Sequence, residues 1–423
     1  MKTLAFVTIV LASGLASGLA SGCSQKNANY CPGNPDNNCS EDAATDGSGS
    51  NNNCPAVACA TGVCDTATHT CVQCTSSQPA ACMDTTPICG ANDTCRPCGA
   101  HSECPTSNVC LPSGACGDEA QIAYVDSAGT PNTTCSQAMP CTTIAAALAT
   151  GHPYIKLTGI ISEPVAISTS SPLTFLAAPG AQLTEGIVGP ILTVTGTANV
   201  SIYDLDIFTA AGGNGDGIYM PTGAPTVSLH HVTIDHSGRY GVFAQAGTLS
   251  IDRSTISKNA GGGLNLNAVS FDIKNSFITQ NSGVGFGGIG INMVGAVHSI
   301  EFTTIANNNG DVGNDANGIS CGGLASVITF SNNIIYGNTG TAQVFGTKCS
   351  YAYSDIGPTA PTGVTILNLD PMFKDPTNGD FHLTSTSMLK DMADPAATVP
   401  FDFDGNPRPQ GLHSDMGADE VMP

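Results

Sequence analysis

The sequence predicts an all-β solenoid, because a short strand-like pattern recurs along it at intervals too small for any helix-containing unit. The pattern, apolar-x-x-small-x-apolar-x-x-Asn, repeats every 22 residues (Ile251 to Ile273) to 30 residues (Ile300 to Phe330). Its copies begin at Ile202, Leu229, Ile251, Ile273, Ile300 and Phe330. Alternation with a period of two indicates strands. Each unit therefore predicts one coil of short strands stacked on the next.

A second strand-like segment follows most copies after a loop of variable length. These segments are Gly217-Ile-Tyr-Met220, Gly241-Val-Phe-Ala244, Gly263-Leu-Asn-Leu266, Gly290-Ile-Asn-Met293 and Gly318-Ile-Ser-Cys321. The leading glycine suits a corner that needs positive φ or close backbone approach. The clear copies end in Asn259, Asn281, Asn308 and Asn338. We interpret these as a stacked amide ladder that satisfies turn backbone; the alternative is a ligand-binding row.

Within one unit, Leu249 and Ile251 are expected to point into the core. The chain then bends at Asp252-Arg253, and Ser254 and Ile256 point inward again. This pattern resembles that of the right-handed parallel β-helix of the pectate-lyase-like superfamily, over roughly residues 118–396. The resemblance implies a single-stranded β-helix whose coils lie about 4.8 Å apart. It does not imply a function, because this scaffold carries lyases, hydrolases, epimerases, adhesins and inert spacers.

Both ends of the solenoid need covering. The run from Pro140 to Leu148 predicts a short apolar helix that caps the amino-terminal end, before a first coil at Tyr154–Leu157. Residues 397–423 resemble the carboxy-terminal segment of many bacterial surface proteins with β-helix repeats. We expect this segment to cap the last coil, since a bare strand edge invites end-to-end association.

The amino-terminal region predicts export. Residues 1–22 have one lysine followed by an apolar run, as in a signal peptide. Leu19-Ala-Ser-Gly-Cys23 resembles a bacterial lipobox, although Ala20 stands where an aliphatic residue is usual. The resemblance implies that Cys23 is lipidated and that the protein is held at the cell envelope, at the outer membrane or cell surface. The alternative is an ordinary secretory signal with Cys23 in a disulfide. Residues 23–53 are polar and predict a flexible linker.

Cysteines concentrate between the linker and the solenoid. Setting Cys23 aside leaves 18 of the 19 cysteines, an even number. Residues 54–117 have too few apolar side chains for a core, so disulfides must hold them. The two Cys-x2-Cys pairs in this segment also fit zinc, but an exported cysteine-dense stretch favours disulfides. The connectivity does not follow from the spacing.

Four further cysteines lie beyond residue 117. Cys135 and Cys141 sit together before the cap helix, and we expect them to pair. Cys321 and Cys349 each end a Gly-x-x-Cys and occupy the same place on successive coils. Their Cα atoms are then about 5 Å apart, within disulfide range, so a coil-to-coil disulfide is predicted. The alternative is two stacked thiols.

Charge and loop composition restrict the partners. The net charge is −21 with 12 basic residues, so nucleic acid and anionic membrane surfaces are poor partners, and the membrane is reached only through the lipid. A polyanionic sugar needs bridging cations. The loops before the second strands form one rim and are candidate ligand loops, including Asn214 and Asp216. The loop 309–317 offers oxygen ligands for Ca²⁺ or is simply a turn; its candidates are Asp311, Asn314, Asp315 and Asn317.

Outward positions on adjacent coils predict one charged row. The row consists of His230, Asp252, Lys274 and Glu301. We interpret it as charge pairing between neighbouring strands. A catalytic interpretation uses Asp235, Asp252, Arg253 and Lys274 as base and charge stabilisers. Against it, Thr233 stands where the related lyase motif has Trp. The Arg-x-Pro-x-x-Arg motif of those lyases, the acidic motifs of the hydrolases and the Asp-Pro-His motif of the epimerases do not occur.

Three functional classes remain open from the sequence. The first is a surface-displayed rod that binds extracellular polysaccharide or another cell surface through its loop rim. The second is a divergent polysaccharide lyase or hydrolase that acts on uronic-acid polymers, with Ca²⁺ as its cofactor. The third is a purely structural component of the envelope. The presence of the fold without the known catalytic motifs favours the first class.

Overall fold

The computed structural model describes residues 62–65, 70–185, 189–209, 215–310, 317–323, 326–340, 342–359 and 365–422. The chain divides into two compact units between Gly117 and Asp118. The predicted signal peptide, Cys23 and the linker lie outside the described residues. Among the residues described, no helix is long and apolar enough to cross a membrane.

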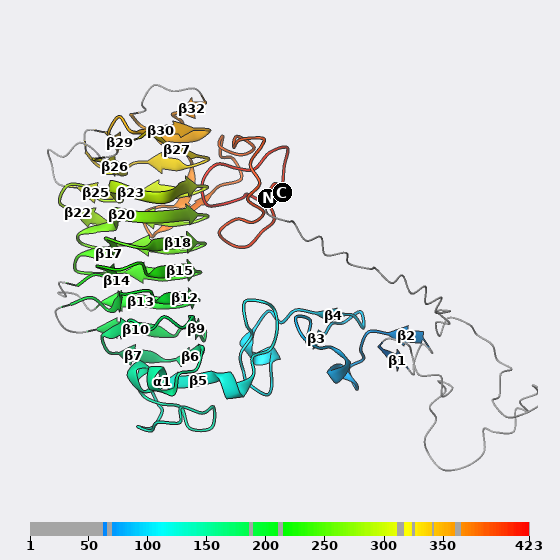
Figure 1. Ribbon diagram of the computed structural model, residues 1–423. Coiled ribbons are helices and arrows are strands. Elements are labelled where there is room, and N and C mark those ends of the chain that lie inside the picture. Colours follow the sequence, from blue (N-terminus) through cyan, green and yellow to red (C-terminus); the bar gives the residue numbers. More distant parts are fainter. Residues whose placement is uncertain are drawn as a thin grey trace, which may run out of the picture. The chain divides into compact units, whose positions relative to one another are not determined.

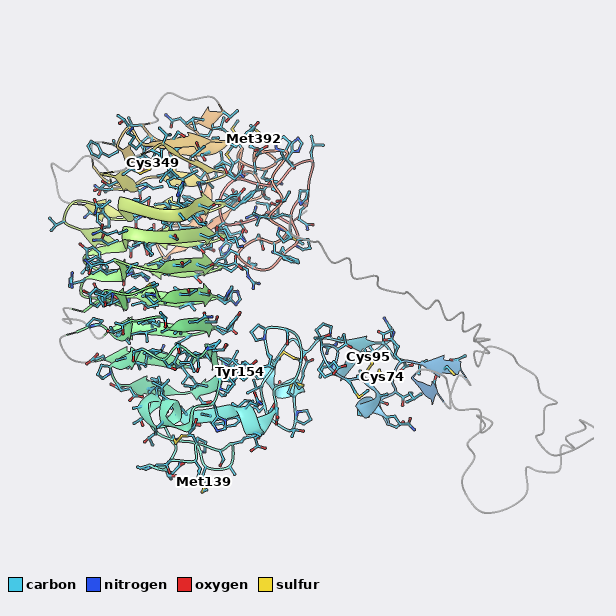
Figure 2. The ribbon with its side chains drawn as sticks, viewed as in Figure 1. Cys74, Cys95, Met139, Tyr154, Cys349 and Met392 are labelled. Atoms are coloured by element: carbon cyan, nitrogen blue, oxygen red, sulfur yellow. A yellow bond between two sulfur atoms is a disulfide. The ribbon has the colours of Figure 1, made fainter. Side chains whose placement is uncertain are left out.

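The first unit is held together by disulfides. Its strands are short: β1 (Val63–Asp65) pairs with β2 (Thr70–Val72), and β3 (Ile88–Cys89) pairs with β4 (Cys95–Arg96). Single turns of 3-10 helix lie at Pro79–Ala81 and His101–Glu103. The disulfides are Cys74–Cys89, Cys82–Cys95, Cys98–Cys110 and Cys104–Cys116 (Figure 2).

These four bonds repeat one connectivity twice. In each consecutive set of four cysteines, the first pairs with the third and the second with the fourth. Cys71 is also disulfide-bonded, and no described cysteine is free. Both Cys-x2-Cys pairs are therefore occupied by disulfides, which excludes the zinc alternative for them.

The second unit is the predicted parallel β-helix, and its coils stack one above the other in Figure 1. Its strands form three columns, which we name A, B and C in the order in which a coil passes through them. Column A contains β5 (Ile122–Asp126), β6 (Tyr154–Thr158), β9 (Leu173–Ala177), β12 (Asn199–Tyr203), β15 (Thr226–His230), β18 (Thr248–Asp252), β27 (Ile328–Ser331) and β30 (Cys349–Ala352).

Column B is a separate parallel sheet. It contains β7 (Ile160–Ser162), β10 (Gln182–Glu185), β13 (Asp206–Thr209), β16 (Thr233–Asp235), β19 (Thr255–Ser257), β21 (Phe277–Thr279), β24 (Thr304–Ala306), β28 (Ile334–Tyr336), β31 (Ser354–Gly357) and β32 (Ile366–Leu367). Column C holds the predicted second-register strands. It contains β8 (Val165–Ile167), β11 (Leu192–Val194), β14 (Ile218–Met220), β17 (Tyr240–Ala244), β26 (Ile319–Cys321) and β29 (Val344–Phe345).

Columns C and A fuse in two consecutive coils. The 13-residue strands β20 (Gly262–Lys274) and β23 (Ile289–Glu301) run through both columns without a corner. They pair in parallel with register irregularities between Leu266 and Phe271, where the other coils turn. A small parallel pair, β22 (Ser282–Gly283) with β25 (Asn309–Gly310), lies in the loops that lead to these coils.

Each coil buries the side chains expected from the repeat. Leu249, Ile251 and Ile256 are fully buried in the continuous core, and Ser254 is buried at the bend between columns A and B. Arg253 at that bend has φ 48°. The residues stacked on it also adopt positive φ; they are His231, Asn275, Phe302, Asn332 and Tyr353. This conformation normally costs a non-glycine residue about 1–2 kcal/mol, so hydrogen bonds at the bend have to offset it.

The predicted amide ladder provides such bonds at the bend between columns B and C. The side-chain oxygen of Asn281 accepts from the backbone N–H and the Nδ2 of Asn259, at 3.1 and 2.9 Å. Its own Nδ2 donates to the Ile256 carbonyl and to Asn308 Oδ1. Asn308 repeats the arrangement with Asn338. Gln343 ends the ladder by accepting from Asn338.

A second ladder follows the bend between columns A and B. The hydroxyl of Ser254 accepts from the Val232 N–H, and the Ser276 hydroxyl accepts from the Ser254 N–H. In later coils Asn333 Oδ1 accepts from the Thr303 N–H, and the Ser354 hydroxyl accepts from the Asn333 N–H. The "small" position of the repeat is therefore a hydrogen-bonding position.

The amino-terminal end is capped by α1 (Ile144–Thr150), as predicted. The Thr143 hydroxyl accepts from the Ala146 N–H at the start of the helix, and Gly151 ends it with φ 75°. The helix buries Ile144 and Ala147 in the core. A 3-10 turn at Glu119–Gln121 leads into β5, which pairs with β6, so the solenoid begins one strand earlier than the predicted first coil.

Disulfides close both predicted pairs in the second unit. Cys135 is bonded to Cys141 beside the cap helix, with Cα atoms 4.7 Å apart. Cys321 is bonded to Cys349 between two successive coils, with Cα atoms 6.1 Å apart. The stacked-thiol alternative for the second pair is therefore excluded.

The carboxy-terminal segment packs along the side of the later coils, and that it also caps the last coil stays a prediction. In Figure 1 the red chain lies beside the coils of β18 to β27. The Ala418 N–H donates to Thr304 Oγ1, and the Gly417 N–H donates to the Asn332 carbonyl. The hairpin of β33 (Phe373–Asp375) and β34 (Asp380–Leu383) belongs to the same cover. We call residues 370–422 the flank segment.

The sequence of column B explains this position. Early strands such as β7 and β16 alternate buried and partly exposed residues, whereas β21 and β24 are buried at every position. Their outward residues Phe277 and Ala306 are apolar and pack against Phe381 and Ala418 of the flank segment. Burying this apolar outer face stabilises the structure.

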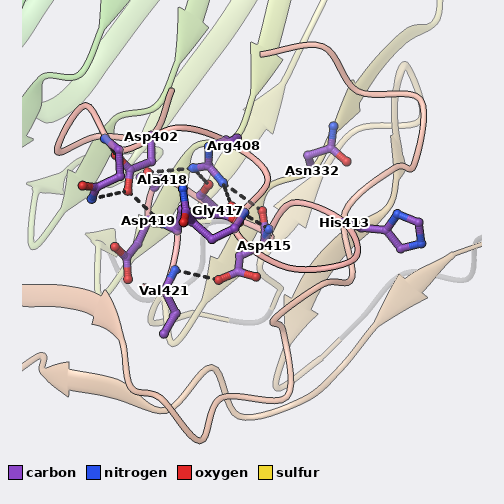
Figure 3. A network of polar contacts seen from close by, with 12 residues as sticks. Asn332, Asp402, Arg408, His413, Asp415, Gly417, Ala418, Asp419 and Val421 are labelled. Atoms are coloured by element: carbon purple, nitrogen blue, oxygen red, sulfur yellow. Dashed lines mark hydrogen bonds and ion pairs between the residues drawn. The ribbon is translucent and has the colours of Figure 1, made fainter. Parts of the chain in front are cut away.

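A buried arginine organises the flank segment (Figure 3). The Arg408 side chain is fully buried and donates to Glu420 Oε2 at 2.9 Å. It also donates to the carbonyls of Asp415, Gly417 and Ala418. Its guanidinium lies 4.5 Å from the ring centroid of Phe302, a residue of the A-to-B bend. Arg408 therefore connects the fold of the segment to the coil that the segment covers.

We predict that Asn281→Ala destabilises the β-helix by about 3 kcal/mol. The substitution leaves several buried backbone and amide groups without partners, at about 1–3 kcal/mol each. Chemical denaturation followed by circular dichroism measures the loss. Asn292→Ala is the matched control, because Asn292 is exposed on β23, and it should change stability by less than ~0.5 kcal/mol. Equal effects of the two variants would contradict a structural ladder.

A buried carboxylate in the last coils predicts a pH dependence. Burial, with a smaller contribution from Asp370, raises the pKa of Asp355 to about 6. One of its oxygens accepts from the Leu369 N–H, and the other is buried without a partner. The folded state therefore binds a proton between the unfolded pKa and about 6, and stability falls as pH rises through that window.

We accordingly expect Asp355→Asn to raise the Tm at pH 7.5 by about 2–4 °C. The amide keeps an acceptor for Leu369 and removes the buried charge. The same substitution should flatten the fall in Tm between about pH 4 and about pH 6.5, measured by calorimetry. A pH profile parallel to that of the unchanged protein would show that Asp355 does not contribute.

Candidate functional site

Two surfaces of the second unit gather chemically useful side chains. One is a cleft between the A-to-B bends and the flank segment. The other is an aromatic surface on the outer face of column C. The structure places three of the four predicted catalytic candidates at the first surface and part of the predicted loop rim at the second.

The cleft has a volume of about 270 Å³. Asp252, Arg253, Lys274 and Asn275 line its coil side, and Pro400 and Phe401 line the side of the flank segment. The structure therefore brings Asp252, Arg253 and Lys274 together, as the catalytic interpretation requires. Asp235 lies on β16 and contacts His236 at 2.9 Å, and it does not line the cleft.

The predicted charged row has the expected register. His230, Asp252, Lys274 and Glu301 are consecutive partners along column A. His230 lies 3.9 Å from Asp252 and stacks on Tyr203. The ammonium of Lys274, however, lies 3.8 Å from Asp272 of its own strand, and Glu301 accepts from Asn332. The row is thus a set of local pairs rather than a continuous chain of ion pairs.

Asp252 is the most tightly held group of the cleft. Asn275 Nδ2 donates to its Oδ1 at 3.1 Å, and Arg253 Nε lies 3.6 Å from its Oδ2. Burial by itself would raise the pKa of Asp252. Hydrogen bonds from His230 and Asn275, with the charges of Lys274 and Arg253, outweigh burial and lower it. Asp252 is therefore an ionised carboxylate at neutral pH, which fits a charge-pairing role and also a general base.

The aromatic surface consists of Tyr219, Tyr240, Phe243 and Phe286. Tyr219 and Phe243 occupy the same outward position on β14 and β17, with ring centroids 5.3 Å apart. Tyr240 lies 5.3 Å from Phe243 and stacks on Phe286 at 5.8 Å, nearly parallel. Phe286 is buried against Gly262 and Gly290, where a Cβ atom would clash with its ring. These glycines therefore make room for the ring.

A cation lies over this surface. The guanidinium of Arg239 is 5.4 Å from the Tyr240 centroid and 5.5 Å from the Phe243 centroid. Asp216, a predicted ligand-loop residue, is fully buried beneath it. Its carboxylate accepts from the Tyr240 N–H at 3.1 Å and from Arg239 at 3.4 Å. Asp216 therefore positions Arg239 and Tyr240 and is not itself exposed to a ligand.

The other loop candidates add little. Asn214, Asp311, Asn314 and Asp315 lie outside the described residues. Asn317 is fully buried, and its Nδ2 donates to the Thr339 carbonyl. The calcium site therefore stays a prediction from the sequence.

Sequence reasoning missed the aromatic surface, although its pattern was present. Tyr219 and Phe243 are the outward residues of the Gly-Ile-Tyr-Met and Gly-Val-Phe-Ala segments. Alternation places them on one face, two coils in succession. Phe286 comes from a glycine-rich loop, where the repeat gives no register, and Tyr240 is the first residue of β17, just before the predicted second-strand segment that begins at Gly241.

Comparison with known proteins gives a limited result. No protein-family model matches the chain, and no curated protein matches it. A solved structure described as the crystal structure of pectate lyase Pel9A is similar at 15% identity with a TM-score of 0.42. The match covers 71% of this chain and 96% of that one. The fold is established by the strand pairing itself.

Substitutions in the cleft should separate charge pairing from chemistry. We expect Asp252→Asn to cost about 1 kcal/mol of stability, because a partly buried, hydrogen-bonded ionic group is lost. The lowered pKa predicts that this contribution is present at neutral pH and is lost as pH falls through the folded-state pKa. Lys274→Ala, which breaks one exposed pair, should cost less than ~0.5 kcal/mol. Denaturation at pH 7 and pH 3 tests this; equal costs at both pH values would contradict it.

Proposed function

We propose that the β-helix is a rod that binds polysaccharide chains through the aromatic surface. The observation that carries this proposal is the contact set of Tyr219, Tyr240, Phe243 and Phe286 beneath the Arg239 guanidinium. A clustered, partly exposed aromatic patch is unusual on a soluble protein surface and marks an interaction site. Aromatic side chains contribute large contact area at low entropic cost.

The geometry suits a chain-like ligand. Tyr219 and Phe243 occupy neighbouring coils, about 4.8 Å apart along the rod, so their rings form a continuous apolar strip. The flat apolar face of a sugar ring can stack on such a strip while its hydroxyls stay in water. The Tyr219 hydroxyl, which donates to Gln245 at 3.1 Å, gives the strip a polar edge.

The charge of the protein narrows the ligand class. With a net charge of −21, the protein repels polyanions at long range. Arg239 offers one forked donor to a hydroxyl or to an isolated carboxylate. We therefore propose a neutral or sparsely acidic polysaccharide as the ligand.

We further propose that the protein is exported and anchored through a lipid on Cys23, with the disulfide-rich unit between anchor and rod. The disulfides of the described residues support an oxidising, extracytoplasmic compartment. Labelling with a radioactive or clickable fatty acid tests the anchor. Loss of label in Cys23→Ser supports it, and unchanged labelling contradicts it.

The binding proposal predicts that Phe243→Ala and Tyr219→Ala each weaken polysaccharide binding at least tenfold. Each substitution removes a stacking platform without touching the buried core. A panel of neutral and uronic-acid polysaccharides in affinity electrophoresis measures the effect. Phe345→Ala is the matched control, because Phe345 is an exposed, outward residue of β29 in the same column. Equal retardation of all three variants would contradict the proposal.

A lyase acting on uronic-acid polymers is the second candidate, and the cleft favours it. Asp252, Arg253 and Lys274 together supply a base and cations beside a cavity of about 270 Å³. Absorbance at 235 nm, from unsaturated uronates, reports such a reaction. Loss of that signal in Asp252→Asn with an unchanged fold would support the enzyme. Absence of signal with every substrate, alongside binding, would leave the binding rod.

A further inference from the structure

A cluster of one histidine and two aspartates lies in the flank segment, and none of the three lines either surface described above. His382 is on β34, and Asp404 and Asp419 come from the long loops that follow it. One ligand atom from each of the three residues lies within 4.8 Å of the other two. Asp419 is 5% exposed, whereas the Asp404 side chain faces solvent. The cluster therefore has a buried floor and an open side.

Asp380 orients the His382 ring so that Nε2 is the nitrogen available to the cluster. Its Nδ1 lies 2.6 Å from Asp380 Oδ1, close enough for that carboxylate to hold a proton on Nδ1. Nε2 is then left as a lone pair. It is buried, has no hydrogen-bond partner and lies 3.5 Å from Asp404 Oδ2. A carboxylate that fixes the remote nitrogen of a histidine is the usual support of a metal-ligating imidazole.

The surroundings reinforce this interpretation. The His382 ring packs edge-on against Phe277 at 5.1 Å and Phe403 at 5.8 Å, which gives the site an apolar wall. One Asp419 oxygen is used by the Leu383 N–H at 2.7 Å, which fixes the carboxylate in place. The lone pair of Nε2 and the Asp404 carboxylate, 3.5 Å apart, repel each other, and a bound cation would convert this repulsion into attraction.

We propose that His382, Asp404 and Asp419 bind a divalent first-row transition metal such as Zn²⁺. One imidazole nitrogen and two carboxylate oxygens are ligands that suit this class, whereas Ca²⁺ and Mg²⁺ prefer oxygen alone. Three protein ligands leave a fourth position open on the exposed side. The metal joins the β33–β34 hairpin to the loops around Arg408, so it cross-links the flank segment, whose His382 ring packs against Phe277 of column B. This proposal is independent of the polysaccharide proposal.

The test uses the full-length, disulfide-intact protein after removal of metal with EDTA. Calorimetric titration with ZnCl₂ should show one site, and CoCl₂ should give visible absorption bands of a coordinated ion. His382→Ala and Asp404→Asn should each weaken Zn²⁺ binding at least tenfold. Asp380→Asn, which removes the support of the imidazole, should weaken it 10- to 100-fold. His413→Ala is the control, because this histidine points away from the Arg408 network (Figure 3).

A second measurement guards against a folding defect. Zn²⁺ should raise the Tm of the unchanged protein and of His413→Ala, but it should not raise the Tm of Asp404→Asn. Because the Asp404 side chain is exposed, Asp404→Asn should have the same Tm as the unchanged protein when no metal is present. Zn²⁺ binding that is equal in all variants would overturn the proposal by locating the metal elsewhere. Absence of any Zn²⁺ uptake would also overturn it.

Discussion

The two side-chain ladders are the constraint on which the rest of the structure depends. The central coils bend twice through residues with positive φ, such as Arg253 and Lys258, which are not glycines. Those bends expose backbone N–H groups inside the rod, where water cannot reach them. Ser254 and Asn259 provide the acceptors, and each ladder residue serves the coil before it. The bonds fix the register between coils, so side chains at equivalent positions are forced into rows.

Because of these rows, the outer faces of columns A, B and C carry different kinds of side chain. On column A the outward row ends each strand with a polar or charged residue, from His230 to Glu301. On column B the later strands carry Phe277 and Ala306, and the flank segment covers them. On column C the outward row carries Tyr219 and Phe243, which remain partly exposed. The same repeat therefore produces a face of polar and charged side chains on column A, a face covered by the flank segment on column B and an exposed aromatic face on column C.

Much of the fold could be predicted because the repeat expresses local rules. Ile251 and Ile256 follow strand alternation, Asn281 follows its ladder, and Cys321 with Cys349 follows the coil spacing. The flank segment could not be placed, because its position depends on Phe302 and Phe277, which resemble ordinary core residues in the sequence. Likewise, Asp216 resembles a loop ligand until the structure shows it buried. Contacts between distant segments have no periodicity to reveal them.

The position of the flank segment also decides which surface is available to a large ligand. By covering the outer face of column B, it narrows access to Asp252 and Lys274 to a cleft bounded by Pro400 and Phe401. The described residues of the flank segment pack on column B and not on the aromatic surface of column C. A long chain can lie across Tyr219 and Phe243 without any rearrangement. The cover on column B is therefore itself an argument that chain-like ligands are bound on column C.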